Sequence, residues 1–155
     1  ILFYGHYDVQ PVDPLELWES DPFTATLKEG RLYARGAQDN KGQSWFVISA
    51  LKALIDAGKL DCTIKVLIEG EEEAGSHGLT AWIPHNKERL KSDLLLICDT
   101  GALTSDIPAV TMGLRGLIIL EARLLGAPKD LHSGVHGGVA PNPAQGIAKL
   151  ISSCF

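Results

Sequence analysis

The chain has 155 residues, of which 45% are hydrophobic and 21% charged, with 16 glycines, 8 prolines and a formal net charge of −5. This length allows a sizeable core, and the composition is typical of a globular protein, which excludes the disordered and fibrous classes. The interspersed charges give no reason to expect nucleic acid or an anionic membrane surface as a partner, and the longest apolar runs are too short to span a bilayer.

The three cysteines, Cys62, Cys98 and Cys154, are odd in number and widely spaced. This spacing predicts neither a disulfide framework nor a Cys-x-x-Cys metal site, and it favours a reducing, cytoplasmic compartment. The chain opens without methionine inside an apolar run, so the sequence leaves open a signal peptide ahead of it.

The first elements in chain order are a strand, a loop and a hairpin. Residues 1–4 form an apolar run that predicts a buried strand ending at Gly5, and residues 6–14 carry two prolines and form a loop. Residues 23–27 and 31–34 flank a Lys-Glu-Gly turn, which is typical of a hairpin. His6 therefore follows directly on the carboxyl end of a strand.

A helix and two further strands follow. Apolar residues recur at helical spacing from about Gln43 until Gly58, which is a suitable C-cap. Residues 63–68 and 93–98 are predicted as core strands, separated by a weaker helical stretch that Pro84 interrupts. This alternation predicts an α/β fold with a largely parallel sheet and helices on both faces.

The last third of the chain has a different composition. A strand pattern runs from the glycines near residue 113 to about Leu125, and residues 131–138 form a glycine-rich loop. Asn142 as N-cap and Pro143 at the first helical position then begin a new helix. We therefore expect a domain boundary near residue 112, with domains at 1–112 and 113–155.

Acidic residues and one histidine gather at the predicted sheet edge. In open α/β sheets ligands bind beyond the carboxyl ends of the strands. Carboxylates with one imidazole suit Zn, Mn or Co, and crowded like charges raise one another's pKa values unless a cation neutralises them. Each residue alone is more typical of a turn, a cap or a solvated surface than of a metal ligand, but together at one sheet edge these residues leave both interpretations open. The residues concerned are His6, Asp39, Glu72, Glu73 and Asp99.

Other catalytic motifs are missing from the sequence. The segment around Lys41 departs from a phosphate-binding loop, because the lysine precedes the second glycine and no Ser or Thr follows in the required place. The sequence has no Gly-x-Ser-x-Gly nucleophile elbow and no His-Glu-x-x-His helix. Chemistry based on a nucleophilic Ser or Cys therefore has no support.

Four segments, Gly5–Pro11, Tyr33–Gly42, Glu69–Ser76 and Asp130–Gly134, resemble in order the signature segments of the M20 metallopeptidase family. The first two are most similar to its carnosinase-like dipeptidase branch. The resemblance implies a zinc-peptidase-like catalytic domain over residues 1–112 and the start of an α+β lid and dimerisation domain over residues 113–155.

The resemblance also implies a role for each matched residue. The matched metal ligands, for two divalent ions, are His6, Asp39, Glu73 and Asp99. Zinc is the favoured metal, with manganese or cobalt as alternatives. In the family, the residue matched by Asp39 bridges the two ions and precedes a cis peptide bond. Asp8 matches the carboxylate that orients the imidazole.

Glu72 matches the general base. We place the Glu pair at 72–73 rather than 71–72, because Gly75-Ser76 follows it at the family's spacing. His132 matches a substrate-binding histidine that reaches the partner subunit's site in dimeric members, whereas His77 and His136 match no ligand position.

The function expected from this resemblance is two-metal hydrolysis of the amide bond in dipeptides or short peptides, by a homodimer assembled through the lid domain. Asp99 favours a dipeptidase, since deacylases of the family tend to have Glu there. The alternatives are an N-acyl amino-acid deacylase, a metal-independent glycosidase using the Glu cluster and Asp99, and a non-catalytic relative. The resemblance places the last ligand histidine beyond Phe155, so we expect the isolated chain to be inactive.

Overall fold

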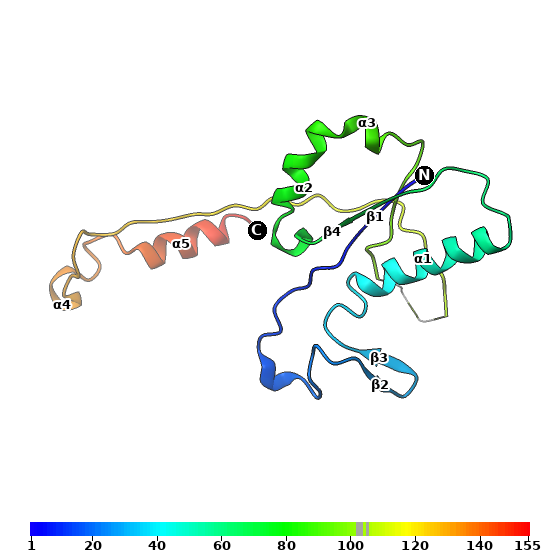
Figure 1. Ribbon diagram of the computed structural model, residues 1–155. Coiled ribbons are helices and arrows are strands. Elements are labelled where there is room, and N and C mark those ends of the chain that lie inside the picture. Colours follow the sequence, from blue (N-terminus) through cyan, green and yellow to red (C-terminus); the bar gives the residue numbers. More distant parts are fainter. Residues whose placement is uncertain (102–103, 105) are drawn as a thin grey trace. The chain divides into compact units, whose positions relative to one another are not determined.

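The computed structural model describes residues 1–101, 104 and 106–155 (Figure 1). The chain divides into two units, Ile1–Val110 and Thr111–Phe155. The assignment of residues 113–155 to a lid domain stays a prediction. Among the described residues, no helix combines the length and the apolar character needed to cross a membrane.

The first unit is built on a parallel sheet of three strands in the order β4-β1-β5. The central strand β1 (Leu2–His6) pairs with β4 (Lys65–Glu69) and with β5 (Leu95–Ile97), and both pairs are parallel. The predicted α/β class with a parallel sheet is confirmed. One boundary was wrong: His6 is the last residue of β1, paired with Glu69, and not the first residue of the loop.

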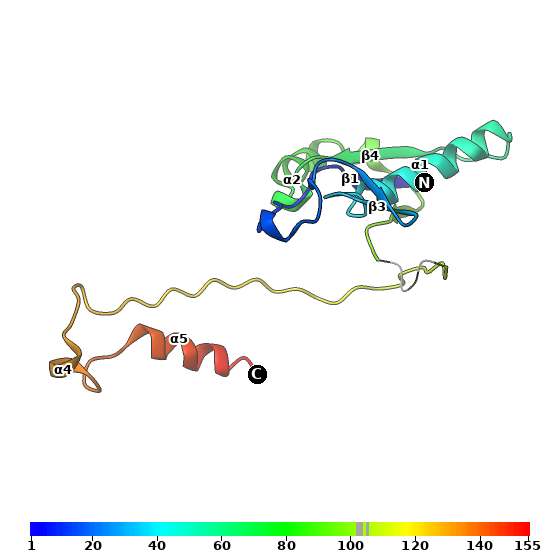
Figure 2. The same cartoon turned by 90° about the horizontal axis from the view of Figure 1, so that it is seen from below.

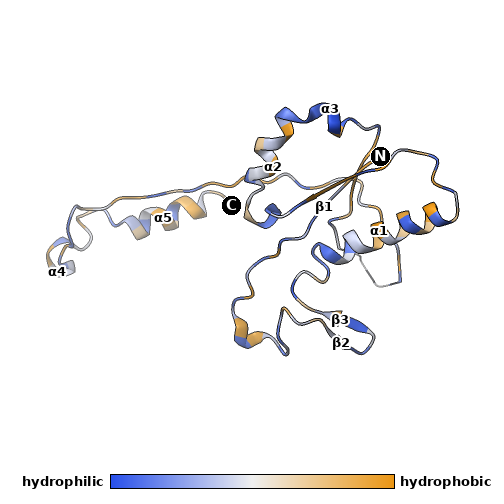
Figure 3. Cartoon of the chain, viewed as in Figure 1, coloured by the Kyte–Doolittle hydropathy of each residue, from blue (hydrophilic) through white to orange (hydrophobic). Residues whose placement is uncertain are grey.

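Helix α1 (Lys41–Asp56) connects the loop after β3 with β4 and packs against β1 (Figures 1 and 2). Hydrophobic and hydrophilic residues alternate along its C-terminal half (Figure 3). Its end forms a Schellman motif, because the N–H of Lys59 donates to the Leu54 carbonyl (2.9 Å) and that of Gly58 to the Ile55 carbonyl (3.0 Å). Gly58 takes the left-handed conformation that this motif requires, with φ of 62°. The predicted C-cap is confirmed.

The predicted hairpin is also present. Strands β2 (Thr26–Lys28) and β3 (Arg31–Tyr33) pair antiparallel, although the first is shorter than predicted. The two connecting residues, Glu29 and Gly30, both have positive φ, 52° and 74°. This is the turn geometry whose twist matches that of the flanking strands. A single 3-10 turn, η1 (Leu15–Leu17), precedes the hairpin.

Short helical segments follow β4. They are η2 (Glu72–Ala74), α2 (His77–Trp82), η3 (Ile83–His85) and α3 (Lys87–Leu90). The change from α2 to a 3-10 turn at Ile83 agrees with the predicted interruption at Pro84, whose ring leaves no N–H for a helical hydrogen bond.

The buried centre of the first unit is unusually polar. Among the described residues of this unit, the buried hydrophobic ones are Leu2, Phe3 and Val47, whereas the largest side chains below 2% exposure are Phe3, His6 and Asn40. Two of these three carry polar groups, and buried polar groups cost free energy unless they are hydrogen-bonded. His6 at the end of β1 and Asn40 just before α1 are therefore part of the buried core.

The second unit differs from the sequence prediction in two places. The strand predicted from the glycines near residue 113 to Leu125 is wrong, because the structure assigns no strand there and most of these residues are exposed. A strand exists only as part of a sheet, and no strand pairs with this segment in the described chain. The second difference is a one-turn helix, α4 (Ser133–His136), within the predicted glycine-rich loop.

Helix α5 (Pro143–Ser152) begins where the sequence predicts. Asn142 is its N-cap, and the Asn142 side chain accepts a hydrogen bond from the Ala144 N–H at 2.9 Å. Pro143 occupies the first helical position, where a missing N–H costs nothing.

Replacing Gly58 with alanine should destabilise the first unit. A side chain at φ of 62° meets its own backbone, which costs about 1 kcal/mol. Urea denaturation followed by circular dichroism measures this loss. Gly58→Asn is the matched control and should retain most of the stability, since asparagine tolerates this conformation. Equal stability of the alanine variant and the unmodified protein would show that the helix end does not depend on this glycine.

Candidate metal centre

The structure brings the predicted site residues of the first unit to one edge of the sheet. His6 ends β1, Glu72 and Glu73 open η2 just after β4, and Asp99 lies shortly after β5. Asp39 comes from the loop before α1. Since the strands are parallel, their carboxyl ends lie at the same edge, and this pairing explains why residues far apart in sequence meet there.

His6 is the centre of this cluster. Its side chain is fully buried, and its Nε2 atom lies 3.1 Å from Asp39 Oδ1, 3.4 Å from Asp99 Oδ2 and 4.0 Å from Glu72 Oε2. Its Nδ1 atom lies 3.1 Å from the Asp8 carbonyl and 3.3 Å from the Asp8 carboxylate. Both ring nitrogens therefore face acceptors only.

These surroundings act on the pKa of His6 in opposite directions. Burial of the ring lowers the pKa, but the Asp99 carboxylate, the hydrogen bond to the Asp8 backbone, the Glu72 carboxylate and the bond to Asp39 together raise it above its ordinary value. A metal ion bound at Nε2 would take the place of that proton, because metal ligands must be deprotonated.

Asp8 connects the imidazole to the loop that carries the two glutamates. Its Oδ2 atom accepts a hydrogen bond from the Glu73 N–H at 2.9 Å. Burial raises the pKa of Asp8, but the backbone N–H groups of Glu73, Glu72 and Asp8 and the charge of His6 together lower it, so the pKa of Asp8 lies below its ordinary value. A charged Asp8 beside Nδ1 keeps the ring proton on that nitrogen and leaves the Nε2 lone pair for a metal.

The two glutamates of η2 differ in their surroundings. Glu72 faces His6. Burial raises the pKa of Glu72, and the charge of His6 lowers it. The carboxylates of Glu73, Asp99 and Asp39 raise the pKa further, so that it lies above its ordinary value. Glu73 instead accepts a hydrogen bond from Gln10 Nε2 at 2.6 Å. A glutamate whose pKa is raised by burial and by neighbouring carboxylates is a candidate for acid–base chemistry.

Two sets of donor atoms fit a metal ion. His6, Asp39 and Asp99 form one set, and His6, Glu72 and Glu73 the other; within each set the atoms lie within 4.8 Å of one another. An imidazole with carboxylates is a donor set that divalent zinc, manganese or cobalt accepts. The residue common to the two sets is His6, and Asp39 belongs only to the first, so the bridging role of Asp39 stays a prediction. The Asp39–Asn40 peptide bond is cis, as the resemblance implies.

Sequence reasoning missed two buried residues beside the cluster. Asn40, 1% exposed, donates from Nδ2 to Asp99 Oδ1 at 3.0 Å. Glu69 accepts hydrogen bonds from the Tyr4 hydroxyl and, at 3.0 Å, from the Ser76 hydroxyl. Burial and the Glu69 carboxylate raise the pKa of Tyr4 well above its ordinary value. In the sequence, the only indication that Asn40 and Glu69 belong to the site was their position inside the segments that resemble the family.

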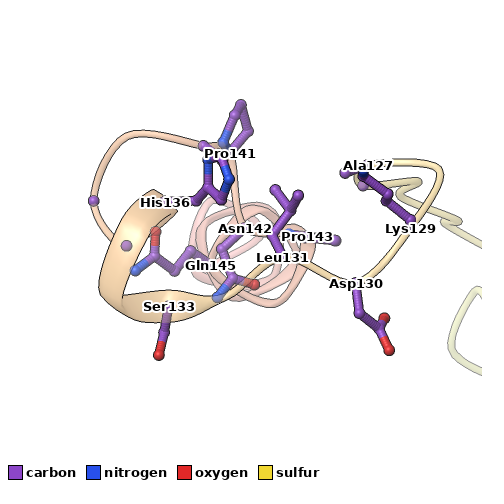
Figure 4. A pocket seen from close by; sticks show the side chains of 14 residues that line it. Ala127, Lys129, Asp130, Leu131, Ser133, His136, Pro141, Asn142, Pro143 and Gln145 are labelled. Carbon is purple, nitrogen blue, oxygen red and sulfur yellow. The ribbon is translucent and has the colours of Figure 1, made fainter.

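The remaining predicted site residue, His132, lies in the second unit. It is the N-cap of α4, and its Nδ1 accepts a hydrogen bond from the Gly134 N–H at 3.0 Å. The adjacent loop forms a pocket of about 390 Å³, shown in Figure 4, whose lining includes Asp130, Ser133 and His136. The substrate-binding role of His132 stays a prediction.

Comparisons with known proteins agree with this site. Residues 2–145 match the Peptidase_M20 family, described as peptidase family M20/M25/M40. The chain therefore belongs to peptidase family M20, whose metallopeptidases use divalent metals.

Two of the relatives that the chain matches are named as dipeptidases. The chain is 39% identical over 158 residues to a Beta-Ala-His dipeptidase of Homo sapiens, covering 99% of this chain and 31% of that protein. It is 37% identical over 156 residues to a Cysteinylglycine-S-conjugate dipeptidase of Corynebacterium striatum, covering 100% of this chain and 34% of that protein. The chain thus spans about a third of the length of the curated relatives it matches.

Solved structures show the same family. The crystal structure of an M20 family metallo-carboxypeptidase from Sulfolobus solfataricus matches with a TM-score of 0.63 and 47% identity, covering 64% of this chain and 23% of that chain. At this identity the match supports the family as well as the fold.

The electrostatic coupling within η2 is directly measurable. In the metal-free protein, Glu73→Gln should lower the pKa of the Glu72 carboxyl, because the Glu73 charge raises it. Carboxyl-carbon NMR of glutamate-labelled protein follows this titration. Glu71→Gln is the control and should change the pKa less, since the Glu71 carboxylate accepts a hydrogen bond from the Gly78 N–H. A pKa of Glu72 that does not respond to Glu73→Gln would contradict the described geometry.

Proposed function

We propose that the protein containing this chain is a metal-dependent dipeptidase that hydrolyses the peptide bond of its substrate. The observation that carries this proposal is the convergence of a buried histidine with Asp39, Asp99, Glu72 and Glu73 at one sheet edge. The relatives named as dipeptidases support the substrate class.

We assign His6, Asp39 and Asp99 as ligands of one ion, and Glu73 with Asp39 as ligands of a second. Zinc is the favoured metal, since imidazole and carboxylate donors suit it. Divalent ions held there supply Lewis-acid polarisation of the scissile carbonyl and a lowered pKa of water. Asp8 keeps the His6 ring in the orientation that presents Nε2.

Glu72 is the proposed general base. It faces the cluster, 4.0 Å from His6 Nε2, and its raised pKa brings it closer to the range in which a carboxylate exchanges protons near neutral pH. Glu72 takes a proton from the attacking water, holds it on its carboxyl group and passes it to the amine that leaves.

The family resemblance carries two further parts of the proposal. The partner subunit's His132 donates to the substrate carbonyl oxygen as charge develops there, the kind of stabilisation that preorganised donors provide. The resemblance also supports a homodimer as the form of the whole protein. The cytoplasmic location that we propose rests instead on the three widely spaced cysteines.

A substrate panel tests the reaction class. We expect the whole protein to hydrolyse β-Ala-His or Cys-Gly dipeptides and to lose this activity on treatment with a chelator. Turnover of N-acyl amino acids in preference to dipeptides would identify a deacylase, and release of carboxyl-terminal residues from longer peptides a carboxypeptidase; either result would overturn the dipeptidase proposal.

Replacing Glu72 tests the general base. In the whole protein Glu72→Gln should leave the metal content unchanged and lower kcat by at least about 100-fold, the low end of what general acid–base catalysis contributes. The matched control is Glu71→Gln, one residue away, which should keep most of the activity. The assignment is wrong if Glu71→Gln abolishes turnover while Glu72→Gln does not.

A further inference from the structure

Asn40 has an unusually complete set of hydrogen bonds for a buried side chain. Its Oδ1 accepts from the His6 N–H at 3.3 Å and from the Ser44 hydroxyl at 3.0 Å. Its Nδ2 donates to the Cys98 carbonyl at 3.3 Å and to Asp99 Oδ1 at 3.0 Å. Two donors and two acceptor positions are all that an amide offers, so its capacity is used in full.

The partners fix which way the amide faces. A backbone N–H can only donate and a carbonyl can only accept, so His6 and Cys98 determine the positions of Oδ1 and Nδ2. A flipped amide would place its N–H₂ group against the His6 N–H and its oxygen against the Cys98 carbonyl oxygen. Asn40 therefore presents a donor to Asp99.

Helix capping does not account for this side chain. Asn40 stands at the N-cap position of α1, where asparagine normally accepts a hydrogen bond from an N–H of the first turn. The Asn40 side chain makes no such bond and is hydrogen-bonded instead to His6 of β1 and to Cys98, just after β5. Gly5 leaves room for it, because a Cβ at residue 5 would lie 3.0 Å from Asn40 Oδ1 and 2.6 Å from Ser44 Oγ.

The hydrogen bond to Asn40 divides the two oxygens of Asp99 between two tasks. Oδ1 is held by Asn40, while Oδ2 lies 3.4 Å from His6 Nε2 and faces the cluster. The same amide holds the backbone of His6, and Asn40 follows Asp39 directly in the chain. One buried side chain thus connects the three residues of the first donor set.

We propose that Asn40 is the positioning residue of the metal centre: its amide holds the Asp99 carboxylate so that one oxygen is presented to a divalent cation beside His6. This inference rests on the proposed function, since it takes Asp99 and His6 as metal ligands. Partners of this kind orient metal ligands, and their loss weakens metal binding by about 10-fold to 100-fold.

Cobalt titration of the metal-free whole protein tests this role, with the visible absorption of bound Co²⁺ as the readout. Asn40→Leu keeps the approximate shape of the side chain and removes its amide, so it should raise the Kd for Co²⁺ by about 10-fold or more. Ser44→Ala removes one hydrogen bond from Oδ1 but leaves both Nδ2 bonds, and it should raise the Kd much less.

A second control separates positioning from general destabilisation. Val47→Ala opens a cavity at a buried position of α1 and should lower the melting temperature while leaving the Kd for Co²⁺ unchanged. If Val47→Ala and Asn40→Leu weaken Co²⁺ binding to the same degree, Asn40 acts only through stability and the inference is overturned.

Asp99→Asn distinguishes this inference from the function on which it rests. If Asp99→Asn leaves Co²⁺ binding intact, the ligand assignment itself fails. If Asp99→Asn weakens binding but Asn40→Leu does not, the assignment stands and only the role of Asn40 is refuted.

Should Asn40→Leu not fold, NMR of the unmodified protein labelled at asparagine decides the question. The Asn40 side-chain N–H₂ should be protected from exchange with water and should shift on addition of Zn²⁺. Exchange as fast as that of a surface asparagine would overturn the inference.

Discussion

The burial of an imidazole among carboxylates at the end of the central strand is the constraint on which the rest of the site depends. His6 has no exposed side-chain surface, and every polar atom around its ring is an acceptor. Such an arrangement is stabilised by a positive charge at its centre, either a second proton on the ring or a bound cation. The raised pKa of His6 favours the second proton on the ring. A bound metal ion would supply the positive charge in place of that proton.

The parallel sheet supplies the framework for this arrangement. β1 pairs with β4 and β5 in a register that sets His6 opposite Glu69 and brings the residues after β5 to the same edge. Because those strand ends are fixed by backbone hydrogen bonds, the acidic side chains are brought together despite their mutual repulsion. Asp8, which accepts from the backbone of Glu73, joins the loop after β1 to the loop after β4.

Much of the first unit could be predicted from local patterns. Apolar runs identified the three strands, helical spacing identified α1, and Gly58 marked its end, because each of these signals depends on residues close together in the chain. The strand ends then placed His6, Asp39, Glu72, Glu73 and Asp99 at a common edge without knowledge of any contact.

The errors and omissions have a common physical origin. The strand pattern after Gly116 is a local signal, but strand formation depends on a partner strand, which local sequence does not specify. The role of Asn40 was missed because asparagine before a helix is ordinarily a cap, and only the tertiary contacts turn its amide toward Asp99. The one-turn helix α4 was missed because its glycines favour a loop, whereas His132 caps its first turn.

The position of a bound metal shows whether His6 is the centre of the site. Crystals of the whole protein grown with Zn²⁺, with diffraction recorded on both sides of the zinc absorption edge, locate the ion independently of any assumed ligand. We expect an anomalous peak about 2.0 to 2.1 Å from His6 Nε2, the usual zinc–imidazole distance, and in contact with the carboxylates of Asp39 and Asp99. A zinc peak whose ligands do not include His6 would show that this histidine does not hold the metal.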